Sequence, residues 1–394
     1  MITIDRALQI ITDQAKPFNS VETILLTAAD GRFLAEDIGA DRDLPPFNRV
    51  AVDGYACKMA DLSLNLEILE TVPAGKKALH TIQQGQCSKV MTGCALPDGA
   101  ETVFMVEDSE VLADGRVRFT AEHHTVRHGN FSLKGEEVKQ GTVIFTAGKR
   151  IAAGDIGSLA LIGAYNINVR KKLKIGVIAT GDELVEPSET PGEVQIRNSN
   201  SYQLLSQIQN AGQEAVYYGI VQDEPAALSA LFARAAAECE ILLLTGGVSA
   251  GDFDFVPQIM QENDFKILFN KVAIKPGKPS TFAVRDNKYV FGLPGNPVSC
   301  FVIFELMVKP LIYKIMGSVF QPVVVTMQLG ADFKRRNADR TEFVPVTIEN
   351  GRALPVRYHG SGHLQALTVT KGWLRIDKDL DFLPKGAEVA VRFF

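Results

Sequence analysis

The sequence has no apolar run that approaches the roughly 18 residues of a membrane span. Charged residues at Asp5 and Arg6 also interrupt the apolar core that a secretory signal peptide would need. We therefore expect a cytoplasmic protein without a membrane partner. The five cysteines are odd in number and form no C-x-x-C pair, so neither a disulfide framework nor a zinc knuckle is indicated. We expect reduced, mostly buried thiols.

The sequence also lacks an excess of basic charge. It has 41 lysines and arginines against 46 aspartates and glutamates, and a formal net charge of −5. No basic stripe of the kind that binds phosphate backbones is present, so nucleic acid is not an expected partner. With 394 residues, 46% of them hydrophobic, the chain is long enough for two to four globular domains of roughly 100 to 200 residues each.

Residues that would support zinc or serine chemistry are scarce. We expect solvated or packing roles for five of the six histidines. His123, His124 and His128 lie in a β-rich stretch without neighbouring ligand carboxylates, and His359 and His363 flank a glycine turn. Ser249 has no evident histidine base. The glycine loop that contains Ser249 is not followed by a Walker lysine. We therefore expect neither a zinc enzyme nor a Walker-type nucleotide site.

The pattern of the first half of the chain predicts a linker domain that is interrupted by an inserted domain. A helix is expected over residues 3–16, and a second helical segment over residues 152–161. Between them, short β-type runs alternate with turn residues, as in antiparallel modules. We assign an elongated linker domain to residues 1–48 and 134–170, and an inserted β-rich domain to residues 49–133.

The second half changes to strands that alternate with helices. Strand-like runs cover residues 173–179, 214–221 and 241–244. Such alternation predicts a parallel sheet with helices on both faces. We assign a three-layer α/β domain to residues 171–318. Short β-type runs then resume, which predicts a β-barrel at residues 319–394. The expected fold is therefore multidomain, α/β plus β.

The most informative stretch is residues 293–299. Asn296 fits the N-cap of a helix, and Pro297 fits its first position. Free N–H groups at such a helix start carry roughly half a positive charge, and Lys275 and Lys278 stand in the preceding proline-rich loop. An ordinary capped helix is the alternative interpretation. Together with the acidic residues described next, the stretch predicts a site for a phosphorylated ligand.

Acidic residues follow the predicted parallel strands, where an open α/β sheet binds its ligands. Gly246 and Gly247 there allow the backbone to approach a ligand closely. Two carboxylates about 4 Å apart repel by roughly 4 kcal/mol at a surface-like dielectric, so the cluster needs a cation, most simply Mg²⁺. The acidic residues concerned are Asp182, Glu183, Asp223 and Asp254. A helix cap explains Asp223 equally well.

Seven motifs in order give the chain a specific resemblance. They lie at residues 52–56, 91–93, 134–137, 180–184, 246–254, 275–279 and 294–299. In this order they resemble the molybdopterin molybdotransferases, the MoeA and gephyrin E-domain family, over essentially the full length. The sequence departs from the usual pattern at Lys134 and Glu137, where bacterial relatives carry arginine and aspartate.

The resemblance implies an enzyme that inserts molybdate into adenylylated molybdopterin and releases AMP together with the molybdenum cofactor. It implies Mg²⁺ at Glu183, Asp223 and Asp254, which would also be catalytic. The implied substrate-binding residues are Gly246, Gly247, Ser249, Lys275, Lys278, Pro294, Asn296, Pro297, Ser299, Arg340 and Ser361. A homodimer is implied as well, with the molybdopterin adenylyltransferase as a candidate partner. In the dimer, the further catalytic residues Asp53, Thr92 and Glu137 of one subunit would face the α/β domain of the other.

Two alternatives stay open at this point. A related α/β enzyme, either the adenylyltransferase or a nucleotide-pyrophosphate hydrolase, would lack the insertion that contains residues 53–55. A scaffold protein would keep the fold for partner binding, usually with a long linker or an appended domain. The intact Lys275, Lys278 and Arg340 favour an active enzyme.

Overall fold

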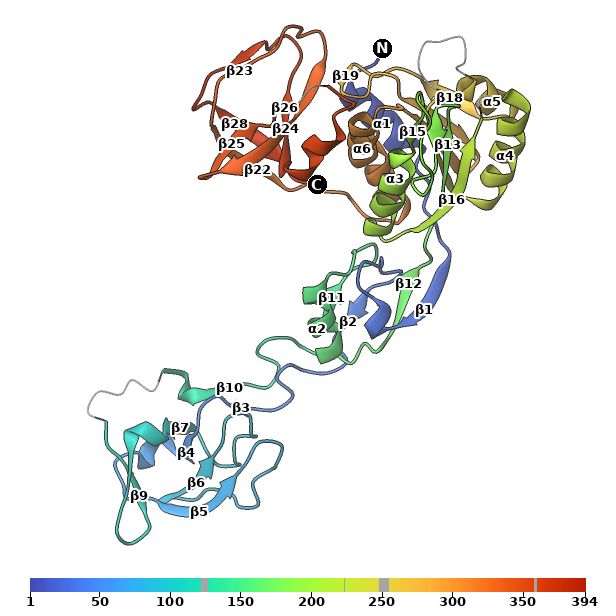
Figure 1. Ribbon diagram of the computed structural model, residues 1–394. Coiled ribbons are helices and arrows are strands. Elements are labelled where there is room, and N and C mark those ends of the chain that lie inside the picture. Colours follow the sequence, from blue (N-terminus) through green and yellow to red (C-terminus); the bar gives the residue numbers. More distant parts are fainter. Residues whose placement is uncertain (122–126, 223, 248–254, 358–359) are drawn as a thin grey trace. The chain divides into compact units, whose positions relative to one another are not determined.

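The computed structural model describes residues 1–121, 127–222, 224–247, 255–357 and 360–394. The chain forms two compact units (Figure 1). The first comprises Met1–Glu36, Ala147–Ala153 and Ile167–Phe394, and the second comprises Asp37–Thr146 and Gly154–Asn166. The chain therefore passes between the two units four times. None of the helices within the described ranges is both long and apolar enough to cross a membrane.

A six-stranded sheet forms the centre of the first unit. In spatial order its strands are β16 (Glu214–Val221), β13 (Lys174–Thr180), β17 (Ile241–Thr245), β21 (Lys288–Leu293), β20 (Thr281–Arg285) and β18 (Lys266–Phe269). The first four run parallel, β20 pairs antiparallel with β21, and β18 pairs antiparallel with β20 at that edge. The predicted parallel sheet is confirmed.

Two hydrophobic cores lie on opposite faces of this sheet. Leu243 in β17 belongs to one core, whereas its neighbours Leu242 and Leu244 belong to the other. All five residues of β17 are buried, because helices cover both faces and side chains alternate between them. This arrangement explains the continuous apolar run in the sequence.

Helices cover both faces of the sheet (Figure 1). On the face of Leu242 lie α4 (Pro225–Glu238) and α5 (Val256–Glu262). On the face of Leu243 lie α1 (Ile4–Gln14), α3 (Ser199–Asn210), α6 (Pro297–Ile303) and α7 (Lys309–Ile315). A π-helical turn, Phe304–Val308, joins α6 to α7. The predicted three-layer arrangement is confirmed.

Helix α1 begins where the sequence predicts, because Thr3 Oγ1 accepts a hydrogen bond from the Arg6 amide at 3.2 Å. Its buried residues Ile4, Ala7 and Ile11 belong to the core of the α/β domain. The expected domain division instead groups this helix with the linker. The apolar spacing of a helix identifies its buried face but not the element that covers it. The four domain boundaries stay a prediction.

Five strands at the carboxyl end close into a barrel. They are β22 (Val324–Leu329), β24 (Thr341–Glu349), β25 (Arg352–Pro355), β26 (Gly372–Ile376) and β28 (Glu388–Arg392). The ring closes because β24 pairs with both β25 and β26, while β22 and β28 bridge the remaining gap. Asn350 and Gly351, with φ of 49° and 73°, form the turn between β24 and β25. The predicted barrel is confirmed.

The second unit contains the predicted β-rich insertion. Its main sheet has the order β5 (Glu67–Val72), β6 (Gln86–Val90), β4 (Gly54–Cys57) and β7 (Thr102–Met105). A side chain at Gly54 would collide with the Phe104 carbonyl oxygen, so β4 can approach β7 only with glycine there. Helix α2 (Ala153–Leu161) lies largely in this unit. All five cysteines of the chain are free and buried, as expected.

Candidate functional site

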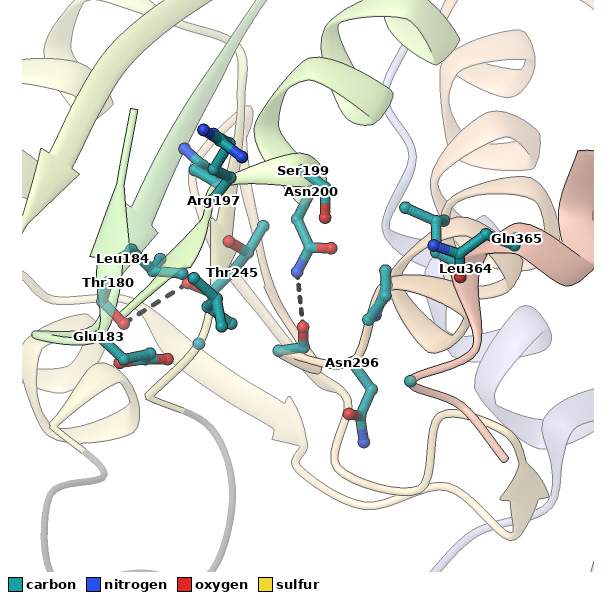
Figure 2. A pocket seen from close by; sticks show the side chains of 16 residues that line it. Thr180, Glu183, Leu184, Arg197, Ser199, Asn200, Thr245, Asn296, Leu364 and Gln365 are labelled. Atoms are coloured by element: carbon teal, nitrogen blue, oxygen red, sulfur yellow. Dashed lines mark hydrogen bonds between the residues drawn. The ribbon is translucent and has the colours of Figure 1, made fainter. Parts of the chain in front are cut away.

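A cavity of about 580 Å³ opens at the carboxyl ends of the parallel strands (Figure 2). Strands β13 and β17 contribute Thr180 and Thr245, where these strands end. The starts of α3 and α6 supply further wall residues, together with a segment near the carboxyl end: Asn198, Ser199, Asn200, Gly295, Asn296, Pro297, Gly362, Leu364 and Gln365. We call this the larger cavity. Its position is the one that the predicted topology assigns to a ligand.

The backbone of the larger cavity is tightly packed around Gly246. This glycine has a φ of 91°, and a side chain on it would collide with the Thr180 carbonyl oxygen. The amide of Asn200 donates to the Gly295 carbonyl oxygen at 2.7 Å, which ties the start of α3 to the loop before α6 (Figure 2). The walls from distant segments are therefore fixed relative to one another.

The start of α3 is held by a hydrogen-bond network. Asn198 caps the helix by accepting from the Ser201 amide at 3.2 Å. Its side-chain amide donates to the Tyr217 hydroxyl at 2.8 Å, and that hydroxyl donates to Glu186 at 2.6 Å. Burial, together with Glu186, raises the pKa of Tyr217 well above its usual range. The phenol therefore stays protonated and keeps its donor.

A second cavity of about 310 Å³, the smaller cavity, gathers predicted residues from three segments of the chain. The proline-rich loop of residues 275–279, the start of α6 and the carboxyl-terminal domain all contribute. Seven of the predicted substrate-binding residues line it: Lys275, Lys278, Pro294, Asn296, Ser299, Arg340 and Ser361. Asn296 lines both cavities. The structure thus brings these residues together, while their roles stay predictions.

The three cations of the smaller cavity are engaged differently. Lys275 Nζ forms an ion pair with Glu342 Oε1 at 2.8 Å. Arg340 Nε lies 3.3 Å from Asp339 Oδ1, and Arg340 Nη1 donates to the Ile274 carbonyl oxygen. The ammonium of Lys278 has no ion-pair partner among the described residues. Lys278 is therefore the cation best prepared to meet an incoming anion.

The start of helix α6 differs in detail from the prediction. Asn296 and Pro297 occupy the N-cap and the first turn as expected. The Asn296 side chain makes no capping hydrogen bond, however. The Val298 amide donates to the Ser361 carbonyl oxygen at 3.1 Å. The predicted set of free N–H groups is therefore smaller, because the carboxyl-terminal segment uses one of them to fix Ser361 beside the cavity.

The predicted carboxylate cluster is described only in part. Glu183 is exposed and lines the larger cavity. Asp223 and Asp254 lie outside the described residues, as does Ser249. Within the described ranges, no group of three or more His, Cys, Asp or Glu residues could hold a metal ion. The Mg²⁺ site therefore stays a prediction. Gly247 follows Gly246 with a φ of 61° and does not line either cavity.

The second unit brings Asp53 and Thr92 together. Asp53 accepts from the Thr92 backbone amide at 2.7 Å and from the Thr92 hydroxyl at 2.8 Å. These two hydrogen bonds hold the pKa of Asp53 below its usual value, because they stabilise the ionised carboxylate. Glu137 instead pairs with Arg49 at 3.0 Å, and both side chains are about half exposed. Two of the three predicted residues thus share one polar cluster.

The substitution Thr92→Val should raise the pKa of Asp53, because one of its two hydrogen bonds is lost. A lowered carboxyl pKa stabilises the fold above the unfolded-state pKa, and this stabilisation disappears as the pH falls through the folded-state pKa. In the variant the stabilisation should therefore be smaller, and its loss should be complete at a higher pH. Carboxyl NMR titration measures the shift, with Asp114, which Arg116 holds, as the control. An unchanged pKa would show that the hydroxyl contributes nothing.

Some wall residues of the larger cavity were not singled out in the sequence. Gly362, Leu364 and Gln365 come from the segment after β25, far in sequence from the α/β domain. The one local signal is the glycine-rich turn around Ser361. Glu342 carries no signal of its own, because it lies in the regular pattern of β24. Its pairing with Lys275 is visible only in three dimensions.

Three family models match the chain in sequence order. The MoeA N-terminal region (domains I and II) matches residues 2–163. A probable molybdopterin-binding domain matches residues 176–314, and the MoeA C-terminal region (domain IV) matches residues 326–394. These matches cover both units of the structure.

Individual relatives agree with these matches. A molybdopterin molybdenumtransferase of Staphylococcus epidermidis is 35% identical over 344 residues, which is 85% of this chain and 81% of the relative. One of Bacillus subtilis is 34% identical over 358 residues, or 89% and 83% of the two chains. The crystal structure of the molybdopterin biosynthesis MoeA protein from Pyrococcus horikoshii OT3 matches with a TM-score of 0.86 and 32% identity over the full length of both chains. The chain therefore belongs to the MoeA family of molybdopterin molybdenumtransferases.

Proposed function

We propose that this chain inserts molybdate into adenylylated molybdopterin and releases AMP and the molybdenum cofactor. The observation that carries the proposal is the smaller cavity, where two lysines, an arginine and two serines from three segments line one space of about 310 Å³. Membership of the molybdopterin molybdenumtransferase family supports the same activity.

The smaller cavity suits a tetrahedral oxyanion. Molybdate is a compact dianion, and charge-assisted hydrogen bonds from ammonium and guanidinium groups bind such ions well. Lys278 and Arg340 supply these groups, while Ser299 and Ser361 add hydroxyl donors. Ser299 is only 3% exposed, so a hydrogen bond from it would form largely out of water and gain strength.

The larger cavity suits the pterin nucleotide. Its volume of about 580 Å³ falls within the usual range for small-molecule sites. Gly246 permits close approach of a ligand to the backbone, and Asn200 fixes Gly295 in the neighbouring loop. Because Asn296 lines both cavities, a nucleotide in the larger one would lie next to the proposed oxyanion site. Proximity of the two reactants is the main contribution that these walls would make.

We assign a Mg²⁺ ion to the rim of the larger cavity. Glu183 lines this cavity and offers a hard oxygen ligand of the type that Mg²⁺ prefers, and Asp223 and Asp254 complete the proposed set. When bound, the ion would offset the charge that develops on the phosphate oxygens as the anhydride breaks. Glu183 is exposed on this rim, so it needs no rearrangement of the core to reach a ligand.

We also propose a homodimer in which Asp53, Thr92 and Glu137 of one subunit complete the site of the other. The ordered Asp53–Thr92 cluster supports a functional role in the second unit. That unit also exposes large apolar side chains that a subunit interface would cover: Leu133, Val143, Leu161 and Tyr165. The molybdopterin adenylyltransferase, which would supply the substrate, is the proposed protein partner.

The direct test measures AMP release from adenylylated molybdopterin with and without molybdate, in the presence of Mg²⁺. We expect release to depend on molybdate and the product to activate a molybdenum-free molybdoenzyme. AMP release at the same rate with and without molybdate would instead indicate a hydrolase. Absence of AMP release, with intact folding, would favour a scaffold or an adenylyltransferase.

A further inference from the structure

Glu342 lies directly beside one of the cavity lysines. The short strand β19 (Ile274–Lys275) pairs in parallel with β24, and the register places Lys275 opposite Glu342. Their ion pair measures 2.8 Å. The Glu342 side chain is 9% exposed, whereas that of Lys275 is 48% exposed. Among the described residues Glu342 does not line the smaller cavity itself, so it acts on the cavity through Lys275.

The same carboxylate faces a second, buried cation. Glu342 Oε2 lies 3.6 Å from Arg335 Nη1, and the Arg335 side chain is 3% exposed. Arg335 in turn donates to the carbonyl oxygen of Arg340 at 2.9 Å and to that of Leu380 at 2.7 Å. Arg335 therefore holds the backbone of a residue that lines the cavity. Glu342 stands between this arginine and Lys275.

Charge and burial make the Glu342 pair sensitive to its partners. A buried carboxylate is stable only when cations or hydrogen bonds compensate it. Of the two carboxylate oxygens of Glu342, Oε2 has no hydrogen-bond partner within the described part of the chain. The close contact between Oε1 and Lys275 Nζ is therefore important for compensating the charge. In return, the carboxylate restrains a flexible four-carbon side chain that would otherwise sample many rotamers.

We propose that Glu342 is a positioning residue for the oxyanion. It holds the Lys275 ammonium at the wall of the smaller cavity and, through Arg335, the backbone at Arg340. The inference rests on the proposed function of this cavity. It predicts that the cavity binds the oxyanion with two cations fixed in advance, Lys275 and Arg340, beside the unpaired Lys278.

The substitution Glu342→Gln tests this role with little change of volume. We expect the half-saturating molybdate concentration to rise roughly fivefold, because Lys275 loses its fixed position. The KM for the pterin nucleotide and the rate at saturating molybdate should stay unchanged. Glu342→Asp, which keeps the charge, should recover part of the loss. Wild-type molybdate dependence of the glutamine variant would overturn the inference.

A double-mutant cycle with Lys275→Met gives the sharper result. Lys275→Met alone leaves the buried carboxylate with Arg335 as its one cationic neighbour among the described residues, so its negative charge is less compensated next to the cavity and repels an anion. Adding Glu342→Gln removes that repulsion, so the double variant should bind molybdate no more weakly than Lys275→Met alone. Independent effects that simply multiply would contradict a coupled pair. Melting temperatures identify any variant that fails to fold. Lys275→Met should fold, because the Lys275 side chain is about half exposed.

Equilibrium dialysis of molybdate separates this inference from the proposed function. If the wild-type protein binds no molybdate and shows no molybdate-dependent AMP release, the proposed function fails and the positioning role fails with it. If the wild type binds molybdate and Glu342→Gln binds it equally well, only the positioning role fails. Glu349→Gln is the matched control, because Glu349 lies at the exposed end of the same strand. We expect this variant to behave as wild type.

Discussion

Replacing Lys278 by alanine is expected to raise the molybdate concentration for half-maximal AMP release by roughly tenfold or more. Lys278 lines the smaller cavity, and its ammonium has no ion-pair partner in the described part of the chain. A charge-assisted hydrogen bond to a compact dianion contributes about 1.5 to 3 kcal/mol, which sets this factor. The affinity for the pterin nucleotide should change little, because its proposed site is the larger cavity.

A matched control is Lys266→Ala, which removes an exposed lysine from β18 of the same unit. This variant should keep the wild-type molybdate dependence. If Lys278→Ala instead lost affinity for the pterin nucleotide and kept its molybdate dependence, the lysine would be a phosphate clamp. The smaller cavity would then not be the oxyanion site.

Asp53→Asn is expected to lower the rate of AMP release about 100-fold, a typical loss when one preorganised charged group is removed from an active site. The side-chain oxygen can still accept from Thr92, so the local structure should survive. Circular dichroism and the melting temperature check the fold, and single-turnover AMP release measures the rate. The exposed Asp114 provides a control, since Asp114→Asn should not affect AMP release.

Mixed dimers decide whether Asp53 acts on the partner subunit. Heterodimers of Asp53→Asn and Lys278→Ala chains can be purified with two affinity tags. If Asp53 completes the site of the other subunit, one of the two sites is intact, and about half of the wild-type activity should return at low molybdate. If Asp53 served its own subunit, both sites would carry one substitution. The mixed dimer would then be as impaired as its parents.

Local chemistry explains why much of the fold was predictable. The strand at Ile241–Thr245 is a continuous apolar run, and Asn198 and Thr3 cap the helices that follow them. Each of these signals depends on neighbours in the sequence, so the sequence contains all the information needed. The turn at Asn350 and Gly351 is of the same kind.

The candidate site was predictable as a set of residues. The proline-rich loop with Lys275 and Lys278 and the start of α6 carry polar groups in positions that favour anion binding. Ser361 and Arg340 entered only through the family resemblance, because nothing in a barrel strand or turn marks them as ligands. Gln365 and Leu364 were missed for the same reason.

The sequence by itself determined the elements, their order and the family, because periodicity, caps and motif order are local properties. Only the tertiary structure decided which elements meet. Helix α1 packs in the α/β core, the Ser361 carbonyl oxygen accepts from Val298, and Glu342 pairs with Lys275 across 67 positions of sequence. Such contacts depend on non-local packing and on strand register. The same local residue pattern is compatible with many packing partners, so the pattern does not identify the partner. The charges that surround the smaller cavity are therefore brought together by the fold and cannot be read from the sequence.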